Sequence, residues 1–294
     1  MLVDLTDEFI EIKQTYAEAS AVLGYDLWQL IMVGPEEQLN STERTQPALL
    51  AGGVALWRIL RNRAAPLPQL LAGHSLGEYT ALVCAEALTF ADALMLVAAR
   101  GRFMQDAVPA GVGAMAAIVG LEPDSIAKMC ADAAQGEVLS PANLNAIGQT
   151  VIAGNMGAVE RALLLAEEQG AKLAKMIPVS VPSHCALMEP AKLRLLQLLE
   201  RTVVQTPKIP VLHNVDVQTH EHPDDIRQIL AAQLVQPVRW VEIIQFMADQ
   251  RVNQIWECGP GKVLAGLIKR IDKTINVVSL SDLEQITQTV RAMA

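Results

Sequence analysis

Residues 69–77, Gln-Leu-Leu-Ala-Gly-His-Ser-Leu-Gly, join a short apolar run to a Gly-x-Ser-x-Gly motif. The run at 69–73 predicts a strand, and the helical pattern at 77–87 predicts a helix directly after it. The glycines are expected because a sharp turn between the two leaves no room for side chains. In such a turn the hydroxyl of Ser75 lies at the helix N-terminus, where the N–H of Leu76 stabilises an oxyanion. The motif predicts a serine nucleophile, with an inert serine in an ordinary strand-turn-helix as the alternative.

A serine nucleophile needs a base, and four of the five histidines are poor candidates for it. His74 lies inside the turn and is expected to point away from Ser75. His213 falls in a predicted strand, where a buried, hydrogen-bonded histidine is more common than a catalytic one. His220 and His222 flank a glutamate in a polar stretch, for which we expect a solvated loop; a metal site is the alternative, but no further ligands cluster nearby.

His184 is the remaining histidine and is predicted to be the base. It follows Pro182, at the point where one pattern of strands and helices gives way to another. Such a change predicts a domain junction, and clefts form preferentially between domains. We therefore expect His184 to face a cleft.

The pattern between residues 113 and 179 is a compact alternation of four short strands and two helices. Their order, βαββαβ, predicts a ferredoxin-like domain inserted into a larger α/β domain. The expected strands are 114–121, 137–143, 150–153 and 172–179, and the expected helices are 123–134 and 155–170.

The larger domain is predicted to be helical before the insert. Its first helix ends near Gly24, a second begins about Pro47, and a third is capped by Thr89 and ends at Arg100-Gly101. After the insert we expect strands near 209–215 and 254–257 and a helix at 262–271. The turn at 259–262, Gly-Pro-Gly-Lys, lacks the spacing of a phosphate-binding loop and is predicted to connect a strand to a helix.

The composition indicates a soluble α/β protein. Of 294 residues, 51% are hydrophobic and 19% charged, which excludes a disordered or collagen-like chain. The net charge of −9 argues against a surface that binds nucleic acid or anionic lipid. The four cysteines form no CxxC pair, and the N-terminus has no signal-peptide pattern. The longest apolar run, 47–57, is too short to cross a bilayer. We expect a cytoplasmic protein with reduced thiols.

Further motifs accompany the serine motif, Gly73–Glu78, in a fixed order. They are Thr45-Gln46-Pro47-Ala48, Arg100-Gly101, Asn143-Leu144-Asn145 with Gln149, Pro182-Ser183-His184 and Glu257-Cys258-Gly259-Pro260-Gly261. With them the chain resembles the malonyl-CoA:acyl carrier protein transacylases of bacterial type II fatty-acid synthesis over nearly its whole length. The resemblance implies an α/β-hydrolase-like core with a parallel sheet at 1–111 and 182–294, a ferredoxin-like insert at 112–181, and an active site between them.

The resemblance also implies a Ser-His dyad that transfers a malonyl group by a ping-pong reaction. Ser75 is then the nucleophile and His184 the base, and the backbone carbonyl of Gln233 holds the other histidine nitrogen. Arg100 would bind the malonyl carboxylate through paired hydrogen bonds. On the pattern alone, a surface cation at a helix C-terminus is the alternative for Arg100. Three polar residues would line the same pocket: Gln46, Asn145 and Gln149.

The implied substrates are malonyl-CoA and phosphopantetheinylated acyl carrier protein. No cofactor, metal, membrane or nucleic acid is implied, and we expect a monomer. Carrier proteins are acidic, so basic residues should mark their docking site. Two clusters are candidates, with scattered solvated side chains as the alternative: Lys172 and Lys175 in the insert, and Lys262, Lys269 and Arg270 after the Gly-Pro-Gly turn.

One part of the family pattern has no counterpart in the sequence as given. The family normally begins with a strand and a Pro-Gly-Gln-Gly-Ser-Gln loop whose glutamine supplies a second oxyanion donor, and Met1 aligns just beyond that loop. Two other functions stay open, the first because it shares the serine motif and the second because of this missing segment. One is a serine esterase or thioesterase, although that fold places an acid between the serine and a late histidine. The other is an impaired acyltransferase that only binds carrier protein.

Overall fold

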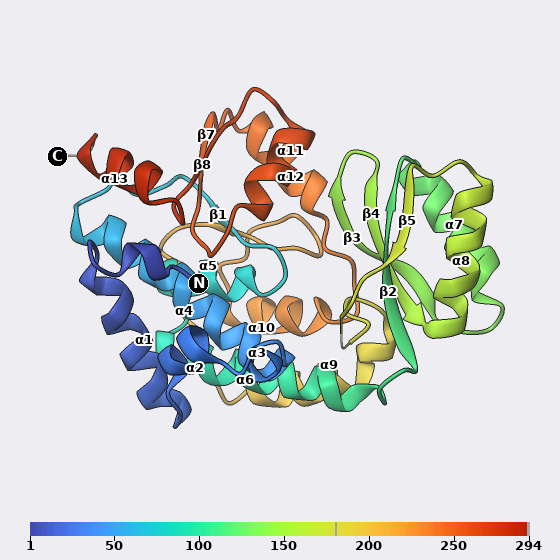
Figure 1. Cartoon of the computed structure of the whole chain (residues 1–294), viewed down its shortest axis with the longest axis horizontal. Helices are drawn as coiled ribbons and strands as arrows, with labels where there is room; N and C mark the ends of the chain where they lie inside the picture. The colour runs from blue at the N-terminus through green and yellow to red at the C-terminus, as the bar shows by residue number, and fades with distance from the viewer. Residues whose placement is uncertain (180, 293–294) are drawn as a thin grey trace.

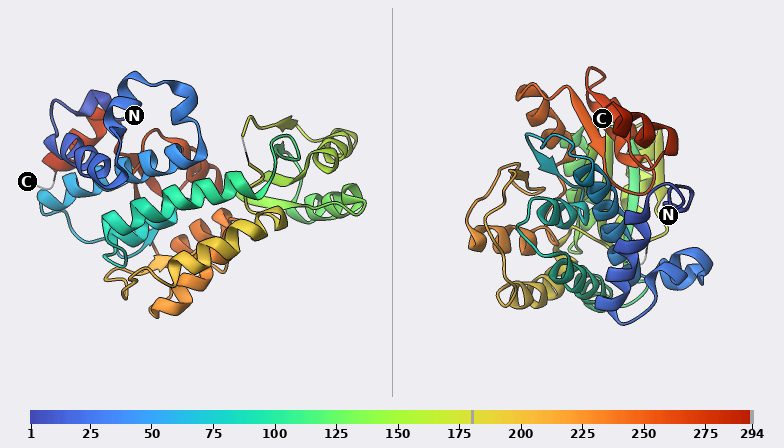
Figure 2. Two further views of the ribbon diagram at one scale, coloured as in Figure 1. Left: turned by 90° about the horizontal axis from the view of Figure 1, so that it is seen from below. Right: turned by 90° about the vertical axis from the view of Figure 1, so that its left-hand side faces the viewer.

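The computed structural model describes residues 1–179 and 181–292. It is a mixed α/β fold in which a helical body surrounds two pairs of parallel strands, and a four-stranded antiparallel sheet lies to one side (Figure 1). Figure 2 shows that this sheet and its two helices form a lobe at one end of the molecule. The chain enters the lobe after the long helix α6 (Phe90–Ala107) and leaves it before α9 (Glu189–Leu199).

The N-terminal part is helical, and its first long helix ends where the sequence predicts. Helix α1 stops at Gly24, whose φ of 75° is the left-handed conformation that glycine adopts at helix ends. Its buried face packs against α4, which is apolar along most of its length. The elements are η1 (Val3–Leu5), α1 (Ile10–Leu23), α2 (Leu27–Val33), α3 (Glu36–Leu39) and α4 (Thr42–Asn62).

Helices α4 and α6 are longer than the sequence predicts. Helix α4 begins at Thr42, so Pro47 lies inside it and removes one hydrogen bond without ending the helix. Helix α6 is capped by the Thr89 side chain, as predicted, but it continues past Gly101. A Cβ at Gly101 would lie 2.5 Å from the carbonyl oxygen of Thr42. Glycine is needed there because α6 crosses the start of α4 closely, and it does not mark a helix end.

The strands of the main body form two parallel pairs. Strand β1 (Leu71–Ala72) pairs with β6 (Val211–Leu212), and β7 (Gln254–Glu257) pairs with β8 (Asn276–Ser279). The prediction for 254–257 is confirmed, whereas the strands expected at 69–73 and 209–215 are only two residues long. Because β1 and β6 run parallel, the carboxyl ends of both strands lie at the same edge of the pair.

The lobe is built on the sheet order β3-β4-β2-β5, and all of its pairings are antiparallel. The register places Ala116 of β2 opposite Ile152 of β4, and both side chains are buried under the two helices. The predicted helix at 123–134 is confirmed residue for residue. The elements are β2 (Gly113–Val119), α7 (Pro123–Ala134), β3 (Leu139–Ala146), β4 (Gln149–Asn155), α8 (Met156–Glu168) and β5 (Leu173–Met176).

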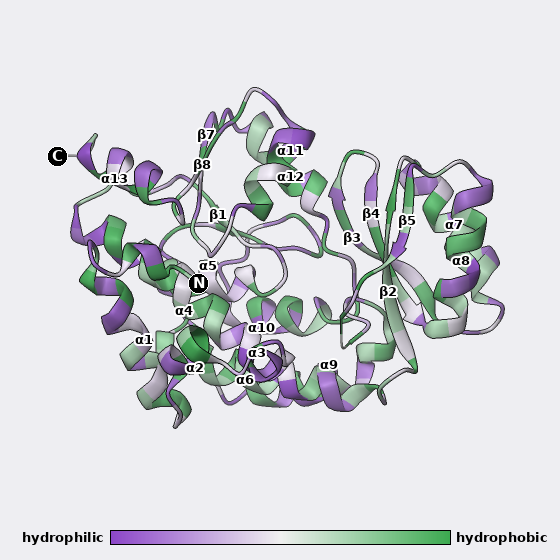
Figure 3. Ribbon diagram, viewed as in Figure 1, coloured by the Kyte–Doolittle hydropathy of each residue, from purple (hydrophilic) through white to green (hydrophobic). Residues whose placement is uncertain are grey.

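The remaining helices complete the body around the strands. Figure 3 shows hydrophilic and hydrophobic residues sharing the outer helices such as α8 and α9, as expected for helices with one buried face. No helix within 1–179 and 181–292 is long and apolar enough to cross a membrane. The elements are α5 (Gly77–Cys84), η2 (Ala186–Met188), α10 (Pro223–Ala232), α11 (Trp240–Asp249), α12 (Val263–Ile271) and α13 (Leu283–Arg291).

Candidate active site

The sharp turn predicted around Ser75 joins β1 to α5. Ser75 has a φ of 52°, in the left-handed region that non-glycine residues rarely adopt. A Cβ at Gly73 would lie 1.9 Å from the carbonyl carbon of Gly77, so this flank admits no side chain, as predicted. A Cβ at Gly77 would meet no atom within 4 Å, so the expectation that the turn leaves no room on that flank is wrong. Strain of this kind persists only where surrounding contacts hold it.

Asn214 supplies such contacts, although no sequence motif points to it. Its Oδ1 accepts a hydrogen bond from the Ser75 N–H over 2.7 Å, and its Nδ2 donates to the Gly73 carbonyl over 2.7 Å. Asn214 follows β6, and the parallel pairing of β6 with β1 brings it beside the turn. The side chain therefore clamps the backbone on both sides of His74.

His184 lies within hydrogen-bond distance of the serine. The Ser75 Oγ is 2.8 Å from the His184 Nε2, and the His184 Nδ1 is 2.7 Å from the carbonyl oxygen of Gln233. A carbonyl only accepts, so Nδ1 carries the proton and Nε2 offers its lone pair to the serine hydroxyl. The imidazole is thus oriented as a base by a backbone group alone, without a carboxylate.

The environment of His184 favours its neutral form. The side chain is buried, and burial together with the nearby charge of Arg100 lowers the pKa of His184 to about 3. The imidazole is therefore unprotonated at neutral pH and free to accept a proton from the serine.

Arg100 is 2% exposed and lies beside the nucleophile, so the alternative of a surface cation at a helix C-terminus is wrong. One terminal nitrogen donates to the Gln46 Oε1 over 2.8 Å. The other donates to the Ser75 Oγ over 3.2 Å and to the Gln233 Oε1 over 3.0 Å. Each of these partners is neutral, and burial lowers the pKa of Arg100. The guanidinium is a desolvated cation of the kind that binds an acyl carboxylate strongly.

The other predicted site residues lie further from the serine hydroxyl. The Asn145 Oδ1 is 2.8 Å from the His74 Nε2, so Asn145 holds the histidine of the turn and not the nucleophile. The Gln149 Oε1 accepts from Arg270 on α12 over 2.6 Å. The Leu76 N–H, at the start of α5, makes no hydrogen bond within 1–179 and 181–292 and is available to an oxyanion.

The histidines rejected as bases have other partners. His213 is buried with its Nδ1 2.7 Å from the Glu78 Oε1, and His220 contacts Asp216 over 2.7 Å. His222 caps α10 by accepting from the Asp224 N–H. Among the described residues, no group of three or more His, Cys, Asp or Glu side chains could hold a metal ion.

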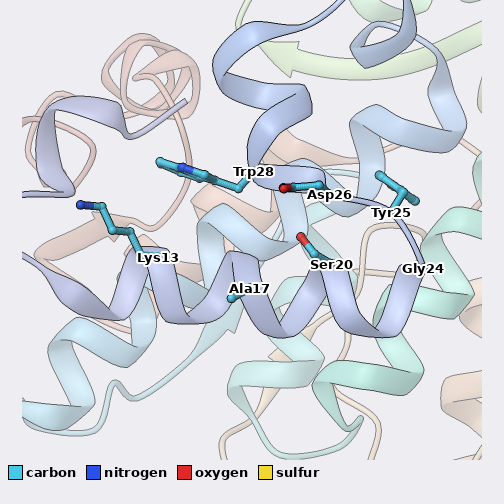
Figure 4. A pocket seen from close by; sticks show the side chains of 7 residues that line it. All are labelled: Lys13, Ala17, Ser20, Gly24, Tyr25, Asp26 and Trp28. Carbon is cyan, nitrogen blue, oxygen red and sulfur yellow. The ribbon is translucent and has the colours of Figure 1, made fainter.

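A surface hollow of about 580 Å³ lies between α1 and α2 (Figure 4). None of its lining side chains contacts Ser75, His184 or Arg100, so it is separate from the cluster described above. The lining residues are Lys13, Ala17, Ser20, Gly24, Tyr25, Asp26 and Trp28.

Comparison with known proteins agrees with a serine acyltransferase site. The model of the acyl transferase domain family matches residues 4–279. The chain belongs to this family. Its curated relatives include the malonyl CoA-acyl carrier protein transacylase of Escherichia coli K12, 52% identical over 96% of this chain and 91% of the relative. The enzyme of the same name from Bacillus subtilis is 38% identical over 99% of this chain and 92% of the relative.

Solved structures of such enzymes have the same fold. The malonyl CoA-acyl carrier protein transacylase of Coxiella burnetii superposes with a TM-score of 0.98 at 50% identity, covering 100% of this chain and 93% of that chain. A malonyl-transacylase in complex with a type II polyketide acyl-carrier protein superposes with a TM-score of 0.98 at 49% identity, covering 99% and 94% of the two chains.

Proposed function

We propose that the protein transfers the malonyl group from malonyl-CoA to the phosphopantetheine thiol of acyl carrier protein, through a malonyl-serine intermediate, in fatty-acid biosynthesis. The observation that carries this proposal is the buried guanidinium of Arg100 at 3.2 Å from the Ser75 Oγ. A cation at that place recognises an acyl group that ends in a carboxylate, and a hydrolase of neutral esters has no use for it. The names of the curated relatives support the same reaction.

In the first half-reaction Ser75 attacks the malonyl thioester carbonyl. His184 Nε2 takes the hydroxyl proton as the Oγ–C bond forms, and the Leu76 N–H stabilises the oxyanion. The C–S bond then breaks, and coenzyme A leaves as a thiol with the proton from His184. Arg100 meanwhile exchanges its bond to the free hydroxyl for contacts with the malonyl carboxylate.

In the second half-reaction the phosphopantetheine thiol gives its proton to His184 and attacks the acyl-serine. The ester C–O bond breaks, the malonyl group is carried away as a thioester, and Ser75 regains its proton from His184. One imidazole thus serves both thiols, and no cofactor takes part. The carrier protein partner is supported by the malonyl-transacylase complex described above.

The domain division belongs to the same proposal. We assign 112–181 to a ferredoxin-like insert, supported by the strand order β3-β4-β2-β5, and 1–111 with 182–294 to an α/β-hydrolase-like core, supported by the serine turn between β1 and α5. Four free cysteines and a coenzyme A substrate support a cytoplasmic location.

Labelled malonyl-CoA tests the function against its alternatives. The expected result is label that stays on the denatured protein in the absence of carrier protein and moves to carrier protein when it is added. Release of free malonate at a comparable rate would indicate a thioesterase. Binding of carrier protein without any acyl-serine would indicate a protein that only binds carrier protein.

A further inference from the structure

Glu78, in the first turn of α5, is a fully buried carboxylate with no assigned role in the reaction. Its Oε1 is 2.7 Å from the His213 Nδ1. Its Oε2 accepts from the Asn214 N–H over 3.0 Å and from the Gln233 Nε2 over 2.9 Å. Both oxygens are therefore occupied, and the carboxylate is held in one position beneath the serine turn.

Gln233 connects this carboxylate to Arg100. Its amide nitrogen faces Glu78, and its amide oxygen accepts from Arg100 over 3.0 Å. A carboxylate only accepts hydrogen bonds, so Glu78 determines which end of the amide faces it and which end faces the guanidinium. The anion and the cation are thus separated by one amide group and do not touch.

The guanidinium has donors to spare for a ligand. Its Nε is buried without a hydrogen-bond partner in the described residues, and its terminal nitrogens contact only neutral oxygens. A buried cation without compensation is costly. Burial lowers the pKa of Arg100, while Tyr79 and the charge of Glu78 act in the opposite direction. A carboxylate in direct contact would compensate Arg100 fully but would occupy the place of the acyl carboxylate.

We propose that Glu78 is a positioning residue that acts through Gln233 as the counter-ion of Arg100 and limits the affinity of the site for the acyl carboxylate. This inference rests on the proposed function. At one amide's distance, Glu78 stabilises the guanidinium without blocking it. It also weakens the attraction for anions, so the malonyl group is not held more tightly in the ground state than transfer requires.

Glu78→Gln removes the charge and keeps the size of the side chain. The new amide oxygen accepts from the Asn214 N–H and the Gln233 amide. The new amide nitrogen donates to the His213 Nδ1, which requires that the His213 proton moves from Nδ1 to Nε2. The Nε2 atom is buried and has no partner in the described residues. The matched control is Glu86→Gln, an exposed acid-to-amide change just after α5, where Glu86 pairs with Lys208 on the surface.

The measurement is calorimetric binding of malonyl-CoA and acetyl-CoA to variants that also carry Ser75→Ala, so that no acyl transfer occurs. In Glu78→Gln we expect the Kd for malonyl-CoA to fall about 3- to 10-fold, with the Kd for acetyl-CoA unchanged. Glu86→Gln should bind both ligands as Ser75→Ala does. A purely structural role for Glu78 predicts the opposite sign, weaker binding of both ligands, and that result or an unchanged Kd would overturn the inference.

The proposed function fails in a different way in this assay. If Ser75→Ala itself binds malonyl-CoA and acetyl-CoA equally, the acyl carboxylate is not recognised and the function is wrong whatever Glu78 does. Should Glu78→Gln not fold, the double variant Glu78→Gln with Gln233→Glu tests the same electrostatics in reverse, because it places a carboxylate directly on Arg100 and leaves an amide at 78 that can donate to it. We expect that variant to lose at least about 10-fold in malonyl-CoA affinity relative to acetyl-CoA, and retention of the preference would overturn the inference.

Discussion

Arg100 donates a hydrogen bond to the Oγ of Ser75 over 3.2 Å in the unacylated protein. The same oxygen lies 2.8 Å from the His184 Nε2. The hydroxyl therefore gives its proton toward a neutral base while it receives a hydrogen bond from a cation. Both contacts favour negative charge on the oxygen, so Arg100 is placed to assist Ser75 in its proposed role as nucleophile.

Substitution of Ser75 or His184 should prevent or slow acylation of the Ser75 Oγ. Ser75→Ala is expected to abolish acyl-enzyme formation, and His184→Ala to slow both half-reactions by about 10³-fold or more, because nucleophile and base act as one unit. Intact-protein and peptide mass spectrometry checks this. Malonate on any residue other than Ser75 would contradict the assignment.

Arg100→Ala should separate malonyl from acetyl transfer. Loss of a buried charge pair with the malonyl carboxylate costs about 2–5 kcal/mol in kcat/KM, whereas acetyl transfer loses only the contact with the serine oxygen. The rates of acylation by malonyl-CoA and acetyl-CoA measure the difference. Equal losses for both would show that Arg100 has a structural role only.

The pH dependence should lack the inflection of an ordinary histidine. Burial and Arg100 lower the pKa of His184 to about 3, so the base stays neutral as the pH falls through 6.5 and the acylation rate stays level there. Arg100→Met removes the cation that helps to lower the pKa of His184. The inflection of the acylation rate with pH should therefore move to higher pH in this variant. Single-turnover acylation from pH 5 to 8 tests both statements. A fall of the parent rate centred near pH 6.5 would contradict them.

The same pKa shift makes a stability prediction. In the unfolded chain His184 takes up a proton near the ordinary histidine pKa of about 6.5, whereas burial and Arg100 lower the pKa to about 3 in the folded protein. The unfolded state therefore binds more protons between these values, and the free energy of unfolding should fall as the pH falls through this window. Denaturant titrations at pH 7 and pH 5 should show a smaller decrease in His184→Gln than in the parent.

Asn214→Ala should loosen the serine turn. It leaves the Ser75 N–H and the Gly73 carbonyl without their partners, and each unsatisfied buried group costs about 1–3 kcal/mol. We expect a comparable loss in the free energy of unfolding and slower acylation by malonyl-CoA and acetyl-CoA alike. Asn276→Ala, at an exposed position of β8, is the control. An unchanged acylation rate in Asn214→Ala would show that the clamp is not needed.

The two basic clusters proposed for carrier docking lie on different parts of the molecule, one in the lobe and one on or next to α12 of the main body. Lys172 and Lys175 are on or next to the edge strand β5, while Arg270 joins α12 to the start of β4. Charge reversal at Lys269 and Arg270, or at the β5 pair, should raise KM for carrier protein and weaken its salt dependence, with the malonyl-CoA half-reaction nearly unchanged. If neither pair affects carrier-protein kinetics, docking uses another surface.

Local patterns predicted the elements that local chemistry determines. Helix α7 and strand β7 lie where expected because proline, glycine and polar residues bound their apolar patterns. The end assigned at Gly101 is wrong because that glycine serves a contact with Thr42, 59 positions away in sequence, and not the helix itself. The sequence contains both kinds of glycine, and only the fold distinguishes them.

The site divides in the same way. The serine turn follows from its motif, His184 follows from elimination among the five histidines, and Arg100 and Gln233 follow from the family pattern. The roles of Asn214 and of the Glu78 and Gln233 side chains could not be predicted from the sequence. Their contacts join residues up to 158 positions apart and depend on the pairing of β1 with β6. Buried polar networks of this kind have no short-range spacing for a pattern to detect.

The contact of Gly101 with the start of α4 has a consequence for redesign of acyl selectivity. Because a side chain at 101 would collide with backbone atoms of Thr42 and Glu43, the neighbouring Arg100 cannot be moved by shifting helix α6 along or around its axis. A library that varies α6 should therefore keep glycine at position 101. Productive diversity is confined to side chains at fixed backbone positions, such as Gln46, which contacts the guanidinium, and Met104, which contacts Gln46.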